Sequence, residues 1–421
     1  MPSTALCLAG PLALALGLGC LLPGAAHAGP PGGAVQLEAG FVAERWTRED
    51  GIPVNGLTDV AQTADGMIWL ATYGGLVRFD GLRFEVMDLS RAHLPANVFT
   101  GLAVAPDGWL WAATENHGLV SLRGGEVSGH PQAATAFIEQ ADGLWIGTPG
   151  GLFDARDGQL VPLSPPSPHT ILAACRDADG RLWLGADQGH LLRVEGDRLV
   201  AGPRVTGADG EPVDVLALAH DGARLWVGSQ AGLFLLDGGQ LVAHPSPRSL
   251  AVHALVADGD GFIAGTQTGP WRMTRGEGRP LPGAEAPPFS ALRRPGLRLP
   301  GGALLTLDRH ALVRDGLPVA TTTAPLTALL VGRRGALWLT TMAGELIRLQ
   351  PRDIELLPGS EGNTYGLLED RQGDVWVASL GGPVRQLRGG RSSGMAESTT
   401  PGRSPRPPTG PSGSATPACA A

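Results

Sequence analysis

A short phrase centred on tryptophan recurs along the chain, and this repeat constrains the fold more than any other feature. Seven of the ten tryptophans occupy the same slot of the phrase, just after an Asp-Gly or Gly-rich turn signal. These are Trp69, Trp111, Trp145, Trp183, Trp226, Trp338 and Trp376. Ile263 and Leu304 fill the slot in two further copies, so that successive slots lie 34 to 43 residues apart. A sustained period of this size indicates a propeller or a solenoid, because one unit cannot bury its own apolar faces.

Each repeat unit carries the signals of four short strands. The run at 67–71 is apolar on both faces, which predicts a middle strand that is covered on both sides. Glycines such as Gly75 and Gly232 follow six residues after the slot and mark the next turn. We therefore predict an all-β fold, a β-propeller of four-stranded blades. A helical solenoid is disfavoured because 63 glycines and 36 prolines would interrupt its helices.

The sequence contains about nine copies of the repeat, and this number does not determine how many blades close the ring. In the first arrangement, the first seven repeats form a seven-bladed ring over residues 36–320, and two further repeats over 321–387 begin a second propeller. The segment 40–48 would then supply the outer strand of a last blade or pair elsewhere. The alternative is one larger ring of eight or nine blades.

The first 28 residues have the features of a secretory signal peptide. Residues 5–22 are apolar, and the Ala-His-Ala sequence at 26–28 offers a cleavage site before Gly29. A lipoprotein cysteine at Cys20 and an uncleaved membrane anchor are the alternatives. We expect export to the periplasm.

Residues 388–421 contain Gly, Ser, Thr, Pro, Arg and Ala but almost no apolar side chains. Such a composition does not offset the entropy of ordering, so a disordered low-complexity tail is expected. The tail is either natural or the product of a truncated or frame-shifted gene, in which case the ninth repeat stops in mid-blade.

Composition and motifs exclude several classes of function. The net charge is −8 and the sequence contains no basic stripe, so nucleic acid is not an expected partner. Only Cys175 and Cys419 remain after signal-peptide cleavage, and the histidines are scattered without metal-ligand spacing. No catalytic constellation or Gly-x-Ser-x-Gly elbow stands out. We therefore expect no catalytic residues, no metal and no cofactor.

Polar side chains recur at two loop positions that a propeller brings to one end of the ring. The residue fourteen positions before the slot is Asn55, Asn97 or His169 in three copies. The turn after the slot contributes Tyr73, Asn116, His117, Gln188 and Gln230. Amides, imidazoles and a phenol would suit a small polar ligand such as a saccharide. Alternatively, these are ordinary solvated turn residues.

The segments 46–55 and 62–81 resemble the two-component-regulator propeller family, and weaker similarity extends over about residues 40 to 387. Members of that family form the periplasmic sensor regions of bacterial histidine kinase or diguanylate cyclase receptors. The resemblance implies two seven-bladed propellers followed by a β-sandwich, a membrane span and an output domain. This sequence departs from the pattern because it shows no sandwich, no later span and no output domain.

These features favour an exported ligand-sensing module of a bacterial signal-transduction receptor that has no output domain of its own. It would bind a small polar solute or a partner protein, associate with a signalling partner or with itself, and be membrane-anchored as part of an intact receptor. A periplasmic propeller enzyme, such as a lyase of the streptogramin-inactivating type, is one alternative. A free-standing protein-interaction scaffold is the other.

Overall fold

The structure is a computed structural model that describes residues 35–37, 41–52, 56–87, 94, 96–140, 143–248, 250–259, 261–281, 296–298, 303–351, 364–369, 375–379, 385–388 and 391–394. The chain divides into two compact units, Met1–Arg352 and Asp353–Ala421. The described residues form antiparallel sheets and three short 3-10 helices, η1 (Arg48–Asp50), η2 (Asp187–Gly189) and η4 (Arg333–Gly335). None of their helices is long and apolar enough to cross a membrane.

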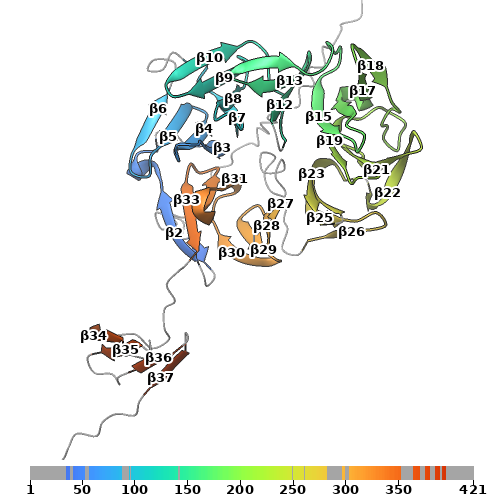
Figure 1. Cartoon of the computed structure of the whole chain (residues 1–421). Helices are drawn as coiled ribbons and strands as arrows, with labels where there is room; N and C mark the ends of the chain where they lie inside the picture. The colour runs from blue at the N-terminus through green and yellow to red at the C-terminus, as the bar shows by residue number, and fades with distance from the viewer. Residues whose placement is uncertain are drawn as a thin grey trace, which may run out of the picture. The chain divides into compact units, whose positions relative to one another are not determined.

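The first unit is a ring of eight sheets, or blades (Figure 1). Blade 1 comprises β3 (Leu57–Gln62), β4 (Ile68–Thr72), β5 (Gly75–Phe79) and β6 (Phe84–Met87). Blade 2 comprises β7 (Phe99–Val104), β8 (Leu110–Thr114), β9 (Leu119–Arg123) and β10 (Glu126–His130). Blade 3 comprises β11 (Ala136–Glu139), β12 (Leu144–Thr148), β13 (Gly151–Arg156) and β14 (Gln159–Pro162). Blade 4 comprises β15 (Ile171–Arg176), β16 (Leu182–Ala186), β17 (Leu191–Glu195) and β18 (Arg198–Ala201).

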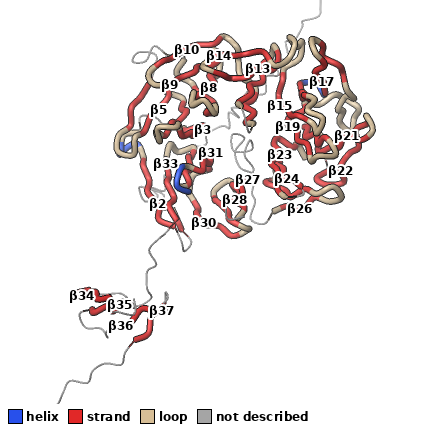
Figure 2. Tube along the Cα trace, viewed as in Figure 1, coloured by secondary structure: helices blue, strands red, loops and turns tan. Residues whose placement is uncertain are grey.

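The remaining blades follow the same antiparallel order, and Figure 2 shows the strands joined by short loops. Blade 5 comprises β19 (Val215–His220), β20 (Leu225–Ser229), β21 (Gly232–Asp237) and β22 (Gln240–Arg248). Blade 6 comprises β23 (Val252–Asp258), β24 (Gly261–Thr266), β25 (Gly269–Met273) and β26 (Gly278–Pro280). Blade 7 comprises β27 (Gly296–Arg298), β28 (Leu304–Leu307), β29 (Ala311–Arg314), β30 (Leu317–Thr321) and the N-terminal β1 (Gln36–Leu37). Blade 8 comprises β31 (Leu326–Val331), β32 (Leu337–Thr341), β33 (Leu346–Pro351) and the N-terminal β2 (Phe41–Trp46).

The tryptophan slot lies on the second strand of each blade, three residues before the strand ends. This strand is apolar on both faces because neighbouring blades cover it, and all five residues of β4 are buried. One interblade cluster joins Trp69 of blade 1 to Phe99 and Leu110 of blade 2. The fold is therefore an all-β propeller of four-stranded blades, held together by apolar layers between the sheets.

The indole N–H of the slot tryptophan needs an acceptor because the ring is buried. Trp69 Nε1 donates to Thr63 Oγ1 at 3.1 Å, and Trp183 Nε1 donates to Asp177 Oδ2 at 3.0 Å. Both acceptors lie six residues before the tryptophan. Blade 2 has Ala105 at this position, and Trp111 Nε1 is buried without a hydrogen-bond partner among the described residues. The sequence thus explains the orphaned donor.

Ala105→Thr is expected to stabilise the protein by about 1 kcal/mol, because the new hydroxyl supplies Trp111 with the acceptor that Thr63 gives Trp69. The measurement is the free energy of unfolding in urea. Ala105→Val has the same shape without the hydroxyl and serves as the matched control. Equal stabilities of the threonine and valine variants would contradict this explanation.

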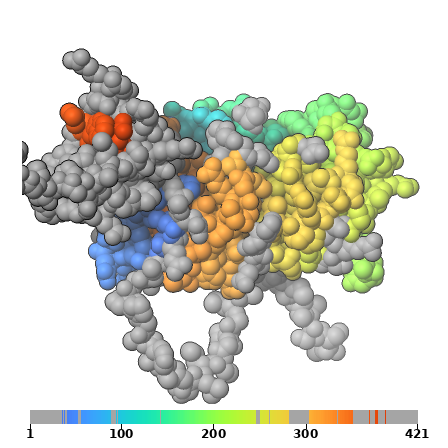
Figure 3. Space-filling model, turned by 90° about the horizontal axis from the view of Figure 1, so that it is seen from below, coloured from blue at the N-terminus to red at the C-terminus, as the bar shows by residue number. Residues whose placement is uncertain are grey.

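The N-terminal segment closes the ring. Strand β2 pairs with β33 along its whole length, from Phe41 opposite Pro351 to Trp46 opposite Leu346. Strand β1 adds to β30 of blade 7, with Gln36 opposite Thr321. Figure 3 shows the N-terminal residues, in blue, beside the orange residues of the last two blades. Blade 8 takes its outer strand from the start of the chain, which is one of the two alternatives that the sequence left open for the segment 40–48.

The ring differs from the seven-bladed arrangement and agrees with the alternative of one larger ring, because the eighth repeat belongs to it. Trp338 of blade 8 packs in one cluster with Leu70 and Phe79 of blade 1, and Trp46 stacks on Trp338 with ring centroids 5.8 Å apart. The chain accordingly divides after Arg352 and not after residue 320. Seven repeats plus an N-terminal strand would leave these apolar faces of blades 1 and 8 uncovered.

The second unit holds the ninth repeat as a four-stranded sheet of β34 (Thr364–Glu369), β35 (Val375–Ser379), β36 (Arg385–Arg388) and β37 (Arg391–Gly394). The ninth repeat therefore does not stop in mid-blade. Strand β37 lies in the range 388–421 that was expected to be disordered. Its backbone pairs with β36, and backbone hydrogen bonds need no apolar side chains. The proposed signal peptide at 1–28 and residues 395–421 lie outside the described residues.

Candidate functional site

The turn between the second and third strands of a blade is held by a buried hydroxyl at its base. Thr72 Oγ1 donates to the Gly75 carbonyl at 2.8 Å and accepts from the Gly74 amide at 3.0 Å. The same hydroxyl-to-carbonyl bond recurs from Thr114, Thr148, Ser229 and Thr266. Sequence reasoning missed this feature, although its signal is plain: a threonine or serine three residues after the slot.

Blade 4 lacks the hydroxyl and positions its turn in another way. Ala186 takes the place of the threonine, and the turn is the 3-10 helix η2, with Gln188 in the left-handed region at φ 50°. The backbone amide of Gln188 donates to Oδ1 of Asp214 at 2.8 Å, and Asp214 lies in the connection between blades 4 and 5. Blade 4 therefore depends on a carboxylate from outside its own repeat to fix this turn.

Asp214 connects the turns of blades 4 and 5. Gln230 Nε2, in the corresponding turn of blade 5, donates to Asp214 Oδ2 at 3.1 Å. Arg204 Nε donates to the carbonyl of Gln188 at 2.9 Å. A continuous polar surface results, which we call the blade 4–5 cluster. Its members are His169, Asp187, Gln188, His190, Arg204, Asp214 and Gln230.

Two imidazoles form the blade 4 side of this cluster. The rings of His169 and His190 stack with centroids 3.6 Å apart, and His169 Nδ1 lies 3.6 Å from Asp187 Oδ1. Burial lowers the pKa of His190, and the neighbouring His169 and Arg204 lower it further, whereas Asp187 opposes the shift. Asp187 Oδ1 is buried without a hydrogen-bond partner among the described residues. His190 is therefore neutral near pH 7, and the two stacked rings offer ring nitrogens and ring edges to a solute.

The pH dependence of stability follows from the sign of this shift. Because the pKa of His190 is lower in the folded protein than its ordinary value of 6.5, the unfolded chain binds the proton more readily. The free energy of unfolding is expected to fall as pH drops from about 6.5 through the folded pKa. His190→Gln should make urea midpoints measured between about pH 7 and 5 less dependent on pH. Lowered pKa values at His130 and His253 act in the same direction, so part of the slope should remain. An unchanged slope would contradict the assignment.

The other proposed ligand residues lie at the same end of their blades but in separate groups. The ring of Tyr73 packs against Gly56, where a Cβ would lie 2.7 Å from Tyr73 Cδ2. In blade 2, the Glu115 amide donates to the Val98 carbonyl, which joins the turn bearing Asn116 and His117 to the loop bearing Asn97. Asn97, Asn116 and His117 are exposed, and Asn55 lies outside the described residues.

The structure thus brings His169, Gln188 and Gln230 together and adds Asp214, Arg204 and His190, which sequence reasoning missed. Asp214 immediately precedes β19 and lies twelve residues before Trp226, two positions from the loop position that the sequence singled out. The cluster can donate and accept hydrogen bonds and can stack a ring, as recognition of a polar solute requires. Within the described residues, no group of three or more His, Cys, Asp or Glu side chains could hold a metal ion.

The described residues of the first unit form an eight-bladed β-propeller, and several solved structures are similar to this chain. No family model matches the chain, and no curated protein matches it. The computationally designed Ika8 protein superposes with a TM-score of 0.50 at 15% identity, over 71% of this chain and 96% of that one. The extracellular domain of a hybrid two-component system from B. thetaiotaomicron is similar at TM-score 0.47 and 18% identity, over 85% of this chain and 49% of that one. Virginiamycin B lyase from Staphylococcus aureus is similar at TM-score 0.43 and 13% identity, over 74% of this chain and all of that one. The chain spans about half the length of the two-component extracellular domain that it matches.

Proposed function

We propose that this propeller is the exported ligand-sensing module of a bacterial signal-transduction receptor, and that the blade 4–5 cluster binds a small polar solute such as a saccharide. The observation that carries the proposal is the departure of blade 4 from its own repeat. Five blades hold this turn with a hydroxyl, whereas in blade 4 the backbone amide of Gln188 donates to Asp214, which also accepts from the side chain of Gln230. Blade 7 also lacks the hydroxyl, because Leu307 stands at this position, so the shared acceptor Asp214 and not the missing hydroxyl distinguishes blade 4.

The chemistry of the cluster favours an uncharged hydroxylated ligand. Asp214 already accepts from the Gln188 amide and from Gln230, so its charge is partly neutralised inside the cluster. Exposed amide side chains offer paired donors and acceptors, which match vicinal hydroxyl groups. The stacked imidazoles add a flat surface for the apolar face of a sugar ring.

The signalling role and the location are part of the same proposal. They are supported by the resemblance of segments 46–55 and 62–81 to two-component-regulator propellers, and by the signal-peptide features of residues 1–28. The chain would work with a membrane-bound output domain, either as part of a longer receptor or through a partner. Expression in a bacterium tests the location. Mature protein that begins at Gly29 in the periplasmic fraction supports export, and protein with an intact N-terminus in the cytoplasm refutes it.

Binding is tested with the full chain on an array of mono- and oligosaccharides, followed by calorimetric titration of any glycan retained. Gln230→Ala and His169→Ala are expected to weaken binding about tenfold each, because each removes direct ligand contacts. Gln240→Ala is the matched control, since Gln240 is an exposed glutamine of blade 5 at the opposite end of the blade. Absence of glycan binding, or equal affinities of the wild-type protein and both cluster variants, would refute the proposal.

A further inference from the structure

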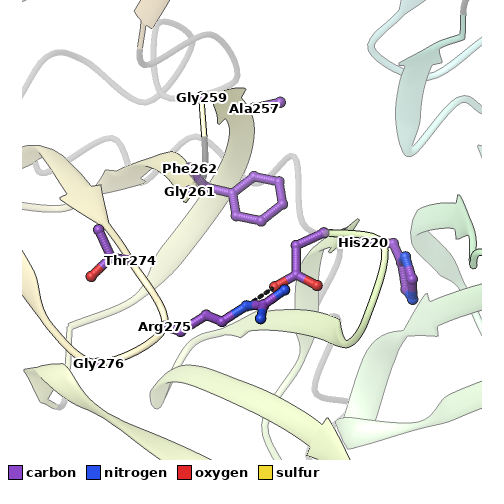
Figure 4. A pocket seen from close by; sticks show the side chains of 9 residues that line it. His220, Ala257, Gly259, Gly261, Phe262, Thr274, Arg275 and Gly276 are labelled. Atoms are coloured by element: carbon purple, nitrogen blue, oxygen red, sulfur yellow. Dashed lines mark hydrogen bonds and ion pairs between the residues drawn. The ribbon is translucent and has the colours of Figure 1, made fainter.

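A pocket of about 740 Å³ lies on the other end of the ring, between blades 5 and 6 (Figure 4). The end of β19 contributes His220, the loop after it contributes Asp221, and the turn after β25 contributes Thr274, Arg275 and Gly276. Phe262 of β24 lines the pocket beside them. These loops follow first and third strands, whereas the turns of the blade 4–5 cluster follow second strands, so the two sites lie at opposite ends of the antiparallel blades.

The negative charge in this pocket is already satisfied by protein donors. Asp221 Oδ2 accepts from Trp226 Nε1 at 3.0 Å and from Arg275 Nε at 3.1 Å. Asp221 Oδ1 accepts from the amides of Ala223 and Arg224, both at 2.9 Å. The carboxylate is 7% exposed and therefore offers little to a ligand.

Among the described residues of the lining, the charged and imidazole groups left to face the pocket are donors. Arg275 is 57% exposed and uses only its Nε on Asp221, so that no described residue accepts a hydrogen bond from its two Nη groups. His220 Nδ1 accepts from the Gly222 amide at 2.9 Å, which places the proton of the neutral ring on Nε2. The pocket thus presents a guanidinium fork and an imidazole N–H.

Two contacts from blade 5 fix the turn that bears Arg275. His244 is buried, and its Nε2 donates to the Thr274 carbonyl at 2.9 Å. Asp221 holds the next residue, Arg275, through the ion pair. The guanidinium is therefore positioned before any ligand arrives, which reduces the entropic cost of binding.

We propose that this pocket is a second ligand site, independent of the blade 4–5 cluster, which binds a small organic carboxylate. The carboxylate would take two parallel hydrogen bonds from the Arg275 Nη groups and one from His220 Nε2. The organic part would lie against Ala257, an exposed residue of the lining. The pocket is larger than an inorganic anion requires, and this size favours an organic acid over phosphate or sulfate.

Calorimetric titration of the full chain with benzoate tests the proposal, with inorganic phosphate as the second arm. Benzoate is expected to bind, phosphate to bind at least about tenfold more weakly, and Arg275→Gln to weaken benzoate binding about tenfold. His220→Asn keeps an acceptor for the Gly222 amide but is too short to place a donor at the position of the imidazole Nε2, and should weaken benzoate binding about fivefold. Arg123→Gln, which removes an exposed arginine at the end of β9, and Gln230→Ala should leave benzoate binding unchanged.

Three results would overturn the proposal: no binding of benzoate, phosphate binding as tight as benzoate binding, or full benzoate affinity in the Arg275→Gln variant. Circular dichroism establishes that each variant is folded. If Arg275→Gln does not fold, the His220→Asn variant decides, because its turn retains the hydrogen bond to Gly222. Full benzoate affinity in that variant would equally overturn the site.

Discussion

A chain that lacks residues 41–46 is expected to lose cooperative unfolding and to aggregate. Without β2, blade 8 keeps three strands and exposes β33 as an unpaired edge. The loss also removes buried Phe41 and the ring contacts of Trp46 with Phe79 and Trp338. The combined effect should be on the order of 5 kcal/mol or more, which is comparable with the whole stability of many domains. Gel filtration and urea unfolding measure the two outcomes.

Single substitutions in β2 separate ring closure from a general effect of deletion. Trp46→Ala should cost about 3 kcal/mol, because it empties a site between blades 1 and 8. Val42→Ala lies on the same strand but alters a side chain that is 46% exposed, and should cost less than about 1 kcal/mol. Similar losses in the two variants would argue against a specific closing contact at Trp46.

Asp221→Ala is expected to cost about 3 kcal/mol, because it leaves the Trp226 indole and two backbone amides without their acceptor. Asp221→Asn should also destabilise, since its amide would turn a donor toward either the indole or the loop amides. Urea unfolding of the full chain measures both. Asp237→Ala is the control, because Asp237 is 55% exposed and its ion pair with Arg224 is worth less than about 1 kcal/mol. A loss at Asp221 no larger than the loss at Asp237 would contradict this reading.

The Asp221 carboxylate also determines how the stability of the protein changes in acid. Burial alone would raise the pKa of Asp221, but hydrogen bonds from Trp226, the neighbouring amides and Arg275 outweigh burial and hold the pKa well below its ordinary value of 3.8. The stabilisation is therefore complete above that value and is lost as the pH falls through the folded pKa. Asp221→Ala should remove this part of the acid dependence.

The repeat could be predicted from sequence because its causes are local. A tryptophan three residues before the end of a strand, followed by a tight turn, gives the same outcome in each copy whatever its neighbours are. Even the worn copies at Ile263 and Leu304 place those residues on β24 and β28. Strand order within each blade follows from the short connections.

Ring closure could not be predicted in the same way. It depends on the pairing of β2 with β33, which are about 300 residues apart, as the contact between Arg45 and Glu345 illustrates. A seven- and an eight-bladed ring differ only in a small rotation per blade, and no repeat signature encodes that angle. The expectation of seven came from the family resemblance and not from the residues.

Part of the candidate site could be predicted from the sequence. Gln188 and Gln230 occupy matching turns, so the repeat alone identified them. Asp214 and Arg204 lie in the connection between β18 and β19, where the residues do not repeat from blade to blade, and His190 follows a turn whose shape depends on Asp214. Their role depends on contacts between blades, which only the folded ring creates.

Limited proteolysis of the full chain, read by mass spectrometry, tests the central claim most directly. A ring of eight blades closed by β1 and β2 predicts one resistant fragment that begins between residues 35 and 41 and ends near residue 351. The fragment should retain β31, β32 and β33, because β2 and blade 1 cover them. A resistant core that ends near residue 320, with blade 8 digested away, would contradict the eight-bladed ring.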